Sequence, residues 1–287
     1  MKRIIVNADD FGLALAVNEA VERAHRAGML TTASLMVAEP AADDAIARAR
    51  ALGSLRVGLH VVLVHGRPAA PPESIPDLLE PDGTFSKDLA AAGVRYFFKP
   101  GIRRQLETEV RAQFARFAAS GLPLDHVNAQ CHFHLHPTVL GIVLRVARDY
   151  GRPPVRVPYE PFGPSWRANR DRFALRFANG VLLGPWVALM RLRLRRAGIP
   201  SNDRVYGISD VGHMTAPRLL RYAAELPDGT TELFFHVATG AWEGMADDLR
   251  GYELAGELDA VTSSAVAGAF AARGAQRIAY GSLRDAS

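Results

Sequence analysis

The sequence has 287 residues, of which 48% are hydrophobic and 22% charged, and its formal net charge is +4. This composition is typical of a globular protein with a sizeable core, and it excludes a disordered or fibrous chain. Cys131 is the only cysteine, so no intrachain disulfide can form and we expect a reducing compartment. The apolar run near the N-terminus has only four residues before two carboxylates, which is too short for a signal peptide. We therefore expect a soluble, cytoplasmic protein.

Short apolar runs alternate with longer amphipathic stretches along the chain. We predict strands at residues 3–7, 32–37, 55–63, 125–132, 155–157, 205–208, 232–237 and 277–280. We predict helices at residues 15–27, 42–51, 102–120, 138–150, 217–225 and 259–273. Strands that alternate with helices indicate a mostly parallel sheet. About eight such units predict a single α/β domain over residues 1–287, a distorted TIM-like (β/α) barrel, with a doubly wound open sheet as the alternative.

The proline-rich stretch at 66–83 is too long for a simple connection between a strand and a helix. Loops of this length are uncommon in compact domains unless they are functional or disordered. We predict either an active-site lid or a disordered excursion.

Reactive side chains of a parallel barrel lie at the carboxyl ends of its strands, and the sequence offers four such places. The first holds Asp9 and Asp10, directly after the first strand and before Gly12. Two adjacent carboxylates at a strand end are costly unless a metal or hydrogen-bond donors compensate them. The second holds His60, which shares one strand face with Gly58. The glycine would leave space there for a bound group, and a packed core histidine is the alternative.

The third place is a histidine-rich segment at 126–136 and is the most specific of the four. With a period of two, polar side chains line one face of the predicted strand and apolar ones the other. The polar face comprises Asn128, Gln130, His132, His134 and His136. Neutral imidazole is a common metal ligand, which favours a metal site over a loop that binds metal adventitiously.

The fourth place is His236, at the end of the predicted strand 232–237, where it is a proton donor or a structural histidine. One carboxylate with two or more imidazoles suits Zn²⁺ or a similar divalent ion. Such an ion activates water, while a second carboxylate and a histidine supply base and acid. These features predict a metal-dependent hydrolase of an amide or ester. A metal-dependent phosphoesterase and a sugar-binding protein that has lost catalysis are the alternatives.

The strand end Asn-Ala-Asp-Asp-Phe-Gly, the later Gly-Leu-His and the histidine-rich segment before Pro137 resemble the YdjC-like carbohydrate deacetylases. The resemblance covers essentially the whole chain. It implies a distorted (β/α) barrel, a divalent metal (Mg²⁺ or Zn²⁺) and hydrolysis of N-acetyl groups from amino sugars. By position it implies Asp10 and His60 as metal ligands, Asp9 as the catalytic base and His236 as an acid.

The third metal ligand departs from the family pattern. An ungapped match puts Gln130 where the family has a histidine, and His132 and His134 follow. We expect His132 to hold the metal, with Gln130 as the alternative ligand, and His134 or His236 to protonate the departing amine. Substrate binding is assigned to three further side chains, Arg156, Tyr159 and Arg284.

Three segments look most like the branch of this family associated with hopanoid biosynthesis: RVPYEPFGPSW, GPWVALMRLRLRRAGIPSND and ISDVGHMT. The resemblance implies removal of acetyl from an N-acetylglucosaminyl hopanoid lipid. We therefore expect a glycosylated hopanoid as substrate, with soluble chito-oligosaccharides as the alternative.

The positive charge of the chain is concentrated in one segment. Residues 166–199 contain eight arginines and one aspartate, a charge of +7, so the rest of the chain sums to −3. The arginines flank the apolar run 181–190, which has about half of the roughly 18 residues that span a bilayer. We predict an inserted interfacial helix or hairpin that makes peripheral contact with membrane lipid and not with nucleic acid. A solvated helix packed on the barrel is the alternative.

Overall fold

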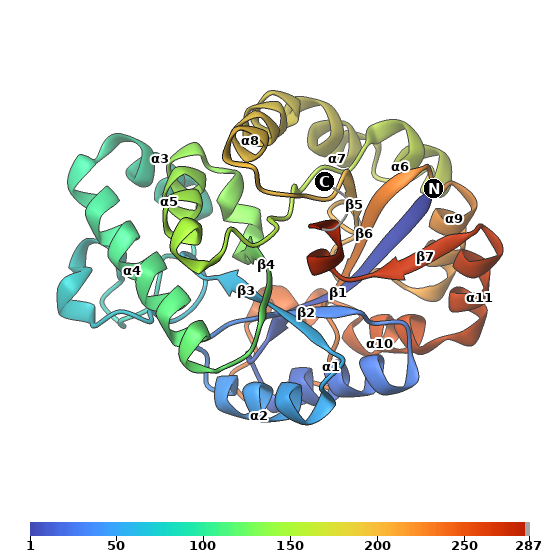
Figure 1. Ribbon diagram of the computed structural model, residues 1–287, viewed down its shortest axis with the longest axis horizontal. Coiled ribbons are helices and arrows are strands. Elements are labelled where there is room, and N and C mark those ends of the chain that lie inside the picture. Colours follow the sequence, from blue (N-terminus) through green and yellow to red (C-terminus); the bar gives the residue numbers. More distant parts are fainter. Residues whose placement is uncertain (285–287) are drawn as a thin grey trace.

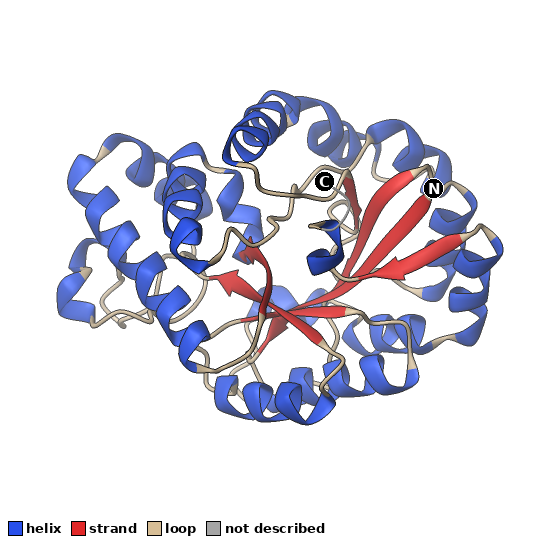
Figure 2. Cartoon of the chain, in the orientation of Figure 1, coloured by secondary structure: helices blue, strands red, loops and turns tan. Residues whose placement is uncertain are grey.

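The computed structural model describes residues 1–284. Its parallel strands form one curled sheet in the order β4-β3-β2-β1-β6-β5, and β7 also pairs with β1. The strands are β1 (Lys2–Phe11), β2 (Thr32–Leu35), β3 (Arg56–Val61), β4 (Leu124–Ala129), β5 (Arg204–Tyr206), β6 (Gly229–Phe235) and β7 (Ala275–Ile278). The strands lie at the centre and the helices surround them (Figure 2). The predicted fold class, an α/β distorted TIM-like barrel, is confirmed.

The helices largely follow the predicted periodicity. They are α1 (Leu15–Ala27), α2 (Ala42–Leu52), α3 (Leu89–Phe98), α4 (Pro100–Ala119), α5 (Pro137–Ala147), α6 (Phe162–Asn169), α7 (Phe173–Phe177), α8 (Gly184–Ala197), α9 (Ala216–Ala224), α10 (Leu254–Thr262) and α11 (Ser264–Ala272). The prediction of one helix over 259–273 is wrong, because Ser263 ends α10 in an extended conformation and its side chain accepts from the main-chain N of Val266. A hydroxyl in this position caps the start of a new helix.

The barrel is closed by an extended segment and not by an eighth strand. Residues 155–157 were predicted as a strand, but only one isolated bridge, between Val155 and Val127, is present there. The main-chain N of Val155 donates to the carbonyl of Pro200, and that of Val205 donates to Tyr159. This segment therefore fills the space between the edge strands β4 and β5 (Figure 1).

Alternation along β1 separates an apolar core from a polar lumen. Ile4, Val6 and Ala8 belong to the large hydrophobic cluster between sheet and helices. Asn7 and Asp9 point the other way and are equally buried. Because successive side chains of a strand face opposite sides, one strand supplies both the packing that stabilises the barrel and the polar groups inside it.

The histidine-rich segment does not continue β4 as predicted. Gln130–Leu135 forms a 3-10 helix, and within it Cys131 and His132 have left-handed φ values of 51° and 54°. The alternation of a strand therefore stops at Gln130. The prediction that His132, His134 and His136 share one strand face is wrong for this reason.

The predicted insertion is helical. The stretch Phe173–Ala197 runs through α7, a π-helical turn and α8, and its length and composition would allow it to cross a membrane. Only 17% of its most apolar window is buried. The apolar stretch is thus longer than the sequence pattern indicated, because the helix continues on both sides of residues 181–190.

The proline-rich loop at 66–83 has a defined conformation, with short 3-10 turns at Pro72–Ser74 and Pro76–Leu78. The buried carboxylate of Glu109 accepts hydrogen bonds from the main-chain N of Ala69 and of Ala70. Such main-chain pairing is what a disordered excursion lacks.

Candidate active site

A cleft of about 700 Å³ opens at the carboxyl ends of the strands. Its walls come from the ends of β1, β2, β3, β4 and β6 and the loops that follow them, and they include Asp10, His65, Gln130 and Trp242. This is the end of a parallel barrel at which reactive side chains gather. The predicted strand-end residues therefore lie in or beside one cavity.

A break in β1 turns Asp10 into this cleft, while Asp9 stays buried in the lumen beside it. On a regular strand Asp9 and Asp10 would face opposite sides. The pairing of β1 with β2 shifts register between Ala8 and Phe11, and Asp10 has a left-handed φ of 64°. A non-glycine residue in this conformation is strained and is often found at functional sites.

Asp9 is held by four hydrogen bonds in the lumen. Its Oδ1 accepts from the amides of Asn7 (2.8 Å) and Asn128 (2.9 Å) and from Arg156 (3.0 Å). Its Oδ2 accepts from Arg156 alone, at 2.6 Å. Burial would raise the pKa of Asp9, but Arg156 holds it well below its usual range. Asp9 is therefore an anion at neutral pH, with a lone pair left on Oδ2.

Arg156 is the cation that makes this burial possible. It is fully buried and also binds Glu232, through Nε at 2.8 Å and through one Nη at 2.5 Å. The Tyr280 hydroxyl donates to the same carboxylate, at 2.5 Å. We predicted substrate contact for Arg156, whereas its guanidinium is occupied by Asp9 and Glu232. It is placed to orient Asp9.

The protonation of His60 is fixed by its neighbour on β4. The amide nitrogen of Asn128 donates to Asp9 and to Ser34, both at 2.9 Å, so the amide oxygen must accept. That oxygen lies 2.7 Å from His60 Nδ1. Nδ1 therefore carries a proton, and in the neutral imidazole Nε2 presents a lone pair to the cleft.

The lone pair of His60 Nε2 faces two oxygen atoms. Gln130 Oε1 lies 2.9 Å away and Asp10 Oδ1 lies 3.5 Å away. Asp10 Oδ1 is buried and has no hydrogen-bond partner among the described residues. In the neutral imidazole these are three acceptor atoms, which repel one another unless a proton or a metal cation lies between them. Asp10 and His60 thus fit the predicted metal ligands, and Gln130 is the third group beside them.

His134 is buried, and His132 is half-buried and lines a separate apolar groove, so neither side chain lines the cleft. His134 Nε2 donates to the carbonyl of Arg156 at 2.9 Å, while its Nδ1 is buried without a partner. Burial lowers the pKa of His134 to about 3 and that of His132 well below its usual range. Both rings are therefore neutral, and His134 has no free N–H to give. Within residues 1–284, no three His, Cys, Asp or Glu side chains are arranged to hold a metal ion.

His236 follows β6 and approaches Asp10 from the other side, with Nε2 at 3.9 Å from Asp10 Oδ2. Its main-chain N donates to Glu257 Oε2 at 2.6 Å, and Met214 donates to the other oxygen at 2.8 Å. Burial raises the pKa of Glu257 to about 8. This carboxyl group fixes the loop that carries His236.

Two predicted substrate-binding residues lie away from the cleft. Tyr159 lines a different cavity and packs under the Arg191 guanidinium, 4.8 Å from its ring centre. Arg284 is exposed and follows a 3-10 turn tied to Asp125, near the start of β4. His136 faces away as well and stacks on the Phe133 ring.

The space beside Gly58 has a different use from the one predicted. A Cβ at this position would come within 2.4 Å of the His126 ring. The absence of a side chain therefore admits His126, whose Nε2 lies 3.0 Å from Ser34 Oγ. Gly58 therefore makes room for a buried histidine ring and not for a bound group.

Several residues of this network were missed by the sequence analysis. Glu232 shares the lumen face of β6 by simple alternation with His236, which is a signal that the sequence carried. Ser34 and Tyr280 carried no such signal, because neither lies in a polar motif. The buried hydrogen-bond network around the predicted site residues also includes Asn7, Ser34, Glu232, Glu257 and Tyr280.

The sequence matches a known family along most of its length. Residues 3–272 match the family model of YdjC-like protein. The chain is similar to a carbohydrate deacetylase of Brevibacillus brevis, with 39% identity over 157 residues that cover 55% of this chain and 60% of that protein. It is also similar to a carbohydrate deacetylase of Vibrio cholerae serotype O1, with 33% identity over 180 residues, 61% of this chain and 64% of that protein. The chain thus spans less than two thirds of the length of these curated relatives.

A solved structure shares the architecture. The crystal structure of a proposed cellobiose-phosphate cleavage protein from Enterococcus faecalis V583 aligns over 98% of both chains, with a TM-score of 0.74 and 24% identity. This likeness supports the curled barrel fold alone.

Proposed function

This chain belongs to the YdjC-like protein family, and we propose that it is a carbohydrate N-deacetylase that hydrolyses the acetamide of an N-acetylglucosaminyl substrate. Relatives named carbohydrate deacetylase support the reaction class. The observation that carries the proposal is the convergence of His60 Nε2, Gln130 Oε1 and the unpartnered Asp10 Oδ1 in the cleft. A lone-pair cluster of this kind is what a hydrolytic metal site requires.

We propose that Asp10 and His60 hold a divalent ion and that Gln130, not His132, completes the set. Two oxygens and one nitrogen suit Mg²⁺ or Zn²⁺, with the glutamine making the site weaker for Zn²⁺ than a third imidazole would. Such an ion, when bound, polarises the acetyl carbonyl and lowers the pKa of water. The hydrogen bond from His60 Nδ1 to Asn128 is the outer contact that fixes a ligating imidazole.

The side chains of the cleft supply the proton transfers. Asp9 is the proposed base, because its Oδ2 has a single donor and keeps one lone pair for the attacking water. Arg156 holds that oxygen in place and keeps the carboxylate ionised. His236 is the proposed acid for the departing amine, since its Nε2 lies 3.9 Å from Asp10 Oδ2 at the cleft. His134 is the weaker candidate, because its N–H is bound to a carbonyl.

The proposal is tested by acetate release from N-acetylchitobiose together with the metal content of the purified protein. We expect Asp10→Asn and His60→Ala to lose bound metal and to reduce turnover at least 100-fold. Gln130→His should bind Zn²⁺ more tightly, whereas His132→Ala should retain the metal. Intact metal binding and turnover in Asp10→Asn would refute the site, and loss of metal in His132→Ala alone would restore His132 as the third ligand.

We further propose a lipid-linked amino sugar, such as a glycosylated hopanoid, as the preferred acceptor. An apolar groove of about 510 Å³ supports this choice. Its walls include Phe97 on α3 and Trp186 on α8, and its floor includes Cys131 and His132. Gln130, the next residue along, lines the polar cleft. Turnover of a lipid-linked substrate that does not exceed that of chitobiose would favour the soluble chito-oligosaccharide.

Peripheral contact with a membrane is the third part of the proposal. Exposed apolar side chains of the insertion support it, among them Phe173, Leu182 and Trp186. Co-sedimentation with lipid vesicles is the direct measurement. A protein that stays in the supernatant with every vesicle composition would contradict this part, and it would leave the deacetylase proposal untouched.

A further inference from the structure

A cavity of about 920 Å³ lies between α4, α5 and α8, outside the catalytic cleft. These helices lie side by side, with α5 in the middle (Figure 1). The charged side chains that line the cavity are six arginines and a single carboxylate, Glu107. The arginines are Arg103, Arg104, Arg145, Arg148, Arg193 and Arg196.

Most of this positive charge is not neutralised by the protein. Arg145 is the one lining arginine that forms an ion pair, with Glu107 at 2.5 Å. Arg193 donates only to a carbonyl, that of Pro137. Arg104, Arg148 and Arg196 have neither a hydrogen bond nor an ion pair from their side chains to any residue of 1–284. Several unpaired guanidinium groups around one cavity favour an anion with several oxygens, such as a phosphate.

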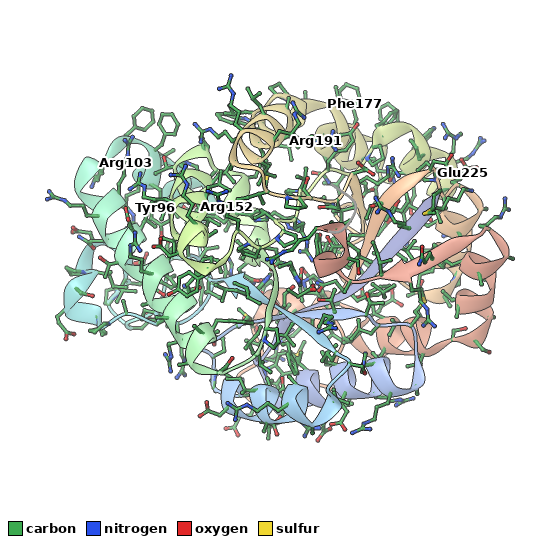
Figure 3. All side chains as sticks on the ribbon, in the orientation of Figure 1. Tyr96, Arg103, Arg152, Phe177, Arg191 and Glu225 are labelled. Atoms are coloured by element: carbon green, nitrogen blue, oxygen red, sulfur yellow. The ribbon has the colours of Figure 1, made fainter. Side chains whose placement is uncertain are left out.

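The basic cavity adjoins the apolar groove, and the two share Phe97, Pro137 and Trp186 as walls. Of the fourteen exposed large hydrophobic side chains among the described residues, eleven lie on α3 or at 173–192, so the apolar surface is confined to this side. In Figure 3, Arg103 of α4 lies at the left of the molecule and Phe177 of α7 at its top. Apolar side chains beside arginines match the acyl chains and the phosphate group of a phospholipid.

We infer that the α4–α5–α8 cavity binds the phosphate headgroup of an anionic phospholipid, while α3 and the insertion enter the apolar layer beside it. The inference deepens the membrane contact proposed above and does not depend on deacetylase activity. The sequence pointed only to the insertion. The structure adds α3 and the arginines of α4 and α5, which lie far from the insertion in sequence.

The insertion lies on the barrel surface and does not leave it to span a bilayer. Arg176 of α7 is fully buried and pairs with Glu160 and Asp210, which are buried as well. A spanning helix would break these pairs and leave buried charges uncompensated. An interfacial helix keeps them, because only its outer face meets lipid.

The decisive experiment measures co-sedimentation with vesicles of phosphatidylcholine alone and of phosphatidylcholine with phosphatidylglycerol. The wild-type protein should prefer the anionic vesicles. The variant Arg104→Gln/Arg148→Gln/Arg196→Gln should lose affinity for them on the order of 100-fold, since each basic residue near an anionic surface contributes about a factor of five. The control, Arg56→Gln/Arg273→Gln/Arg277→Gln, removes the same charge near the amino ends of β3 and β7 and should bind like wild type.

A second pair of variants tests the apolar part. Phe97→Ser/Phe98→Ser should weaken binding to both kinds of vesicle, whereas Leu220→Ser, an exposed leucine on α9, should not. The two arginine variants and Leu220→Ser should release acetate from soluble N-acetylchitobiose at the wild-type rate, and Phe97→Ser/Phe98→Ser should keep the circular dichroism spectrum of the wild type. Loss of binding without loss of that activity separates docking from misfolding.

Four results would overturn the inference. They are equal binding to neutral and anionic vesicles, equal loss in the two arginine variants, arginine-dependent binding of single-stranded nucleic acid in place of vesicles, and saturation by inorganic phosphate with no vesicle binding. A dimer in solution that dissociates in Phe97→Ser/Phe98→Ser would also overturn it, because a second copy of the chain would then cover the groove.

Discussion

Two buried arginines organise two regions of this protein in different ways. Arg156 lies inside the barrel, and its carboxylate partners, Asp9 and Glu232, belong to β1 and β6. Arg176 lies in the insertion and pairs with Glu160 and Asp210, and also with a half-exposed aspartate. Both are fully buried. Burying a charge is costly in either place, so each arginine has to be compensated by a complete set of partners.

The difference between the two clusters lies in what the partners do. In the Arg156 cluster one guanidinium fixes a carboxylate that faces the reaction. In the Arg176 cluster a second guanidinium, that of Arg218, shares Asp171 and Asp210, and no member forms an ion pair with Asp9, Asp10 or His60. The same chemistry thus orients a proposed base in the barrel and fastens an appended helix in the insertion.

The largest effect is expected from Arg156→Met. The change leaves the carboxylates of Asp9 and Glu232 buried without a cation, and removal of one partner from a buried pair costs about 3–5 kcal/mol. Urea unfolding should show this loss, and acetate release should disappear. Arg156→Lys, which keeps the charge, should fold well enough for turnover to be measured and should still be slow, since an ammonium cannot bind both carboxylates in the same geometry. Wild-type turnover in either variant would contradict the positioning role.

Arg176→Met is the matched change in the other region. Arg218 remains to compensate Asp171 and Asp210, so the loss of stability should fall at or below the lower end of the same range of about 3–5 kcal/mol. Turnover of a soluble substrate, per folded molecule, should stay at the wild-type value. A fall in turnover as deep as that of Arg156→Lys would abolish the distinction between the two clusters.

The sequence predicted the parts of the site that depend on alternation. The first strand follows from its continuous apolar run, although β1 continues through Asp9 and Asp10 to Phe11. The lumen position of His60 follows from alternation, and α1 begins and ends where its periodicity indicates. These features are local, because the pattern that specifies them lies within a few residues.

The rest of the site depends on contacts that no local pattern encodes. The left-handed turn at Cys131 and His132 ends the alternation and brings Gln130, not His132, beside His60. The partners of Arg156 come from strands at opposite ends of the sequence. The arginine cavity forms only because α4, α5 and α8 are neighbours in the fold. The sequence could therefore locate the arginines of the insertion, but not the arginines of α4 and α5 that line the same cavity.

Glu257 connects the two regions, because it holds the main chain of His236, and the negative charge of Asp210 adds to the effect of burial on its pKa. Burial raises its pKa to about 8, so between its ordinary pKa and pH 8 the folded protein retains a proton that the unfolded chain releases. Its contribution to stability is complete at acid pH and is lost as pH rises through 8. Glu257→Gln should remove this loss of stability between pH 5 and 8.5, at a pH-independent cost of about 1–3 kcal/mol for one imperfectly paired N–H.

Thermal unfolding of Glu257→Gln at several pH values measures both the pH-dependent loss of stability and the pH-independent cost. The pH dependence of turnover should change too, because the loop of His236 loosens, whereas Glu253→Gln, an exposed neighbour on the same side, should leave the profile unaltered. A variant with the wild-type slope of stability against pH would show that Glu257 is already ionised at neutral pH.

The smallest effect is expected at the open edge of the Arg176 cluster. Partial burial would raise the pKa of Asp171, but Arg218 and Arg176 lower it to about 2. A depressed carboxyl pKa contributes stability that is present above its ordinary value and is lost as pH falls through 2. Asp171→Asn should therefore lower the melting temperature slightly at pH 7, by roughly 2–4 °C or less, and not at all near pH 2. Asp247→Asn, which removes a fully exposed ion pair with Arg250, should change neither value. A large loss at Asp171 would mean that this edge is as closed to water as the cluster around Arg156.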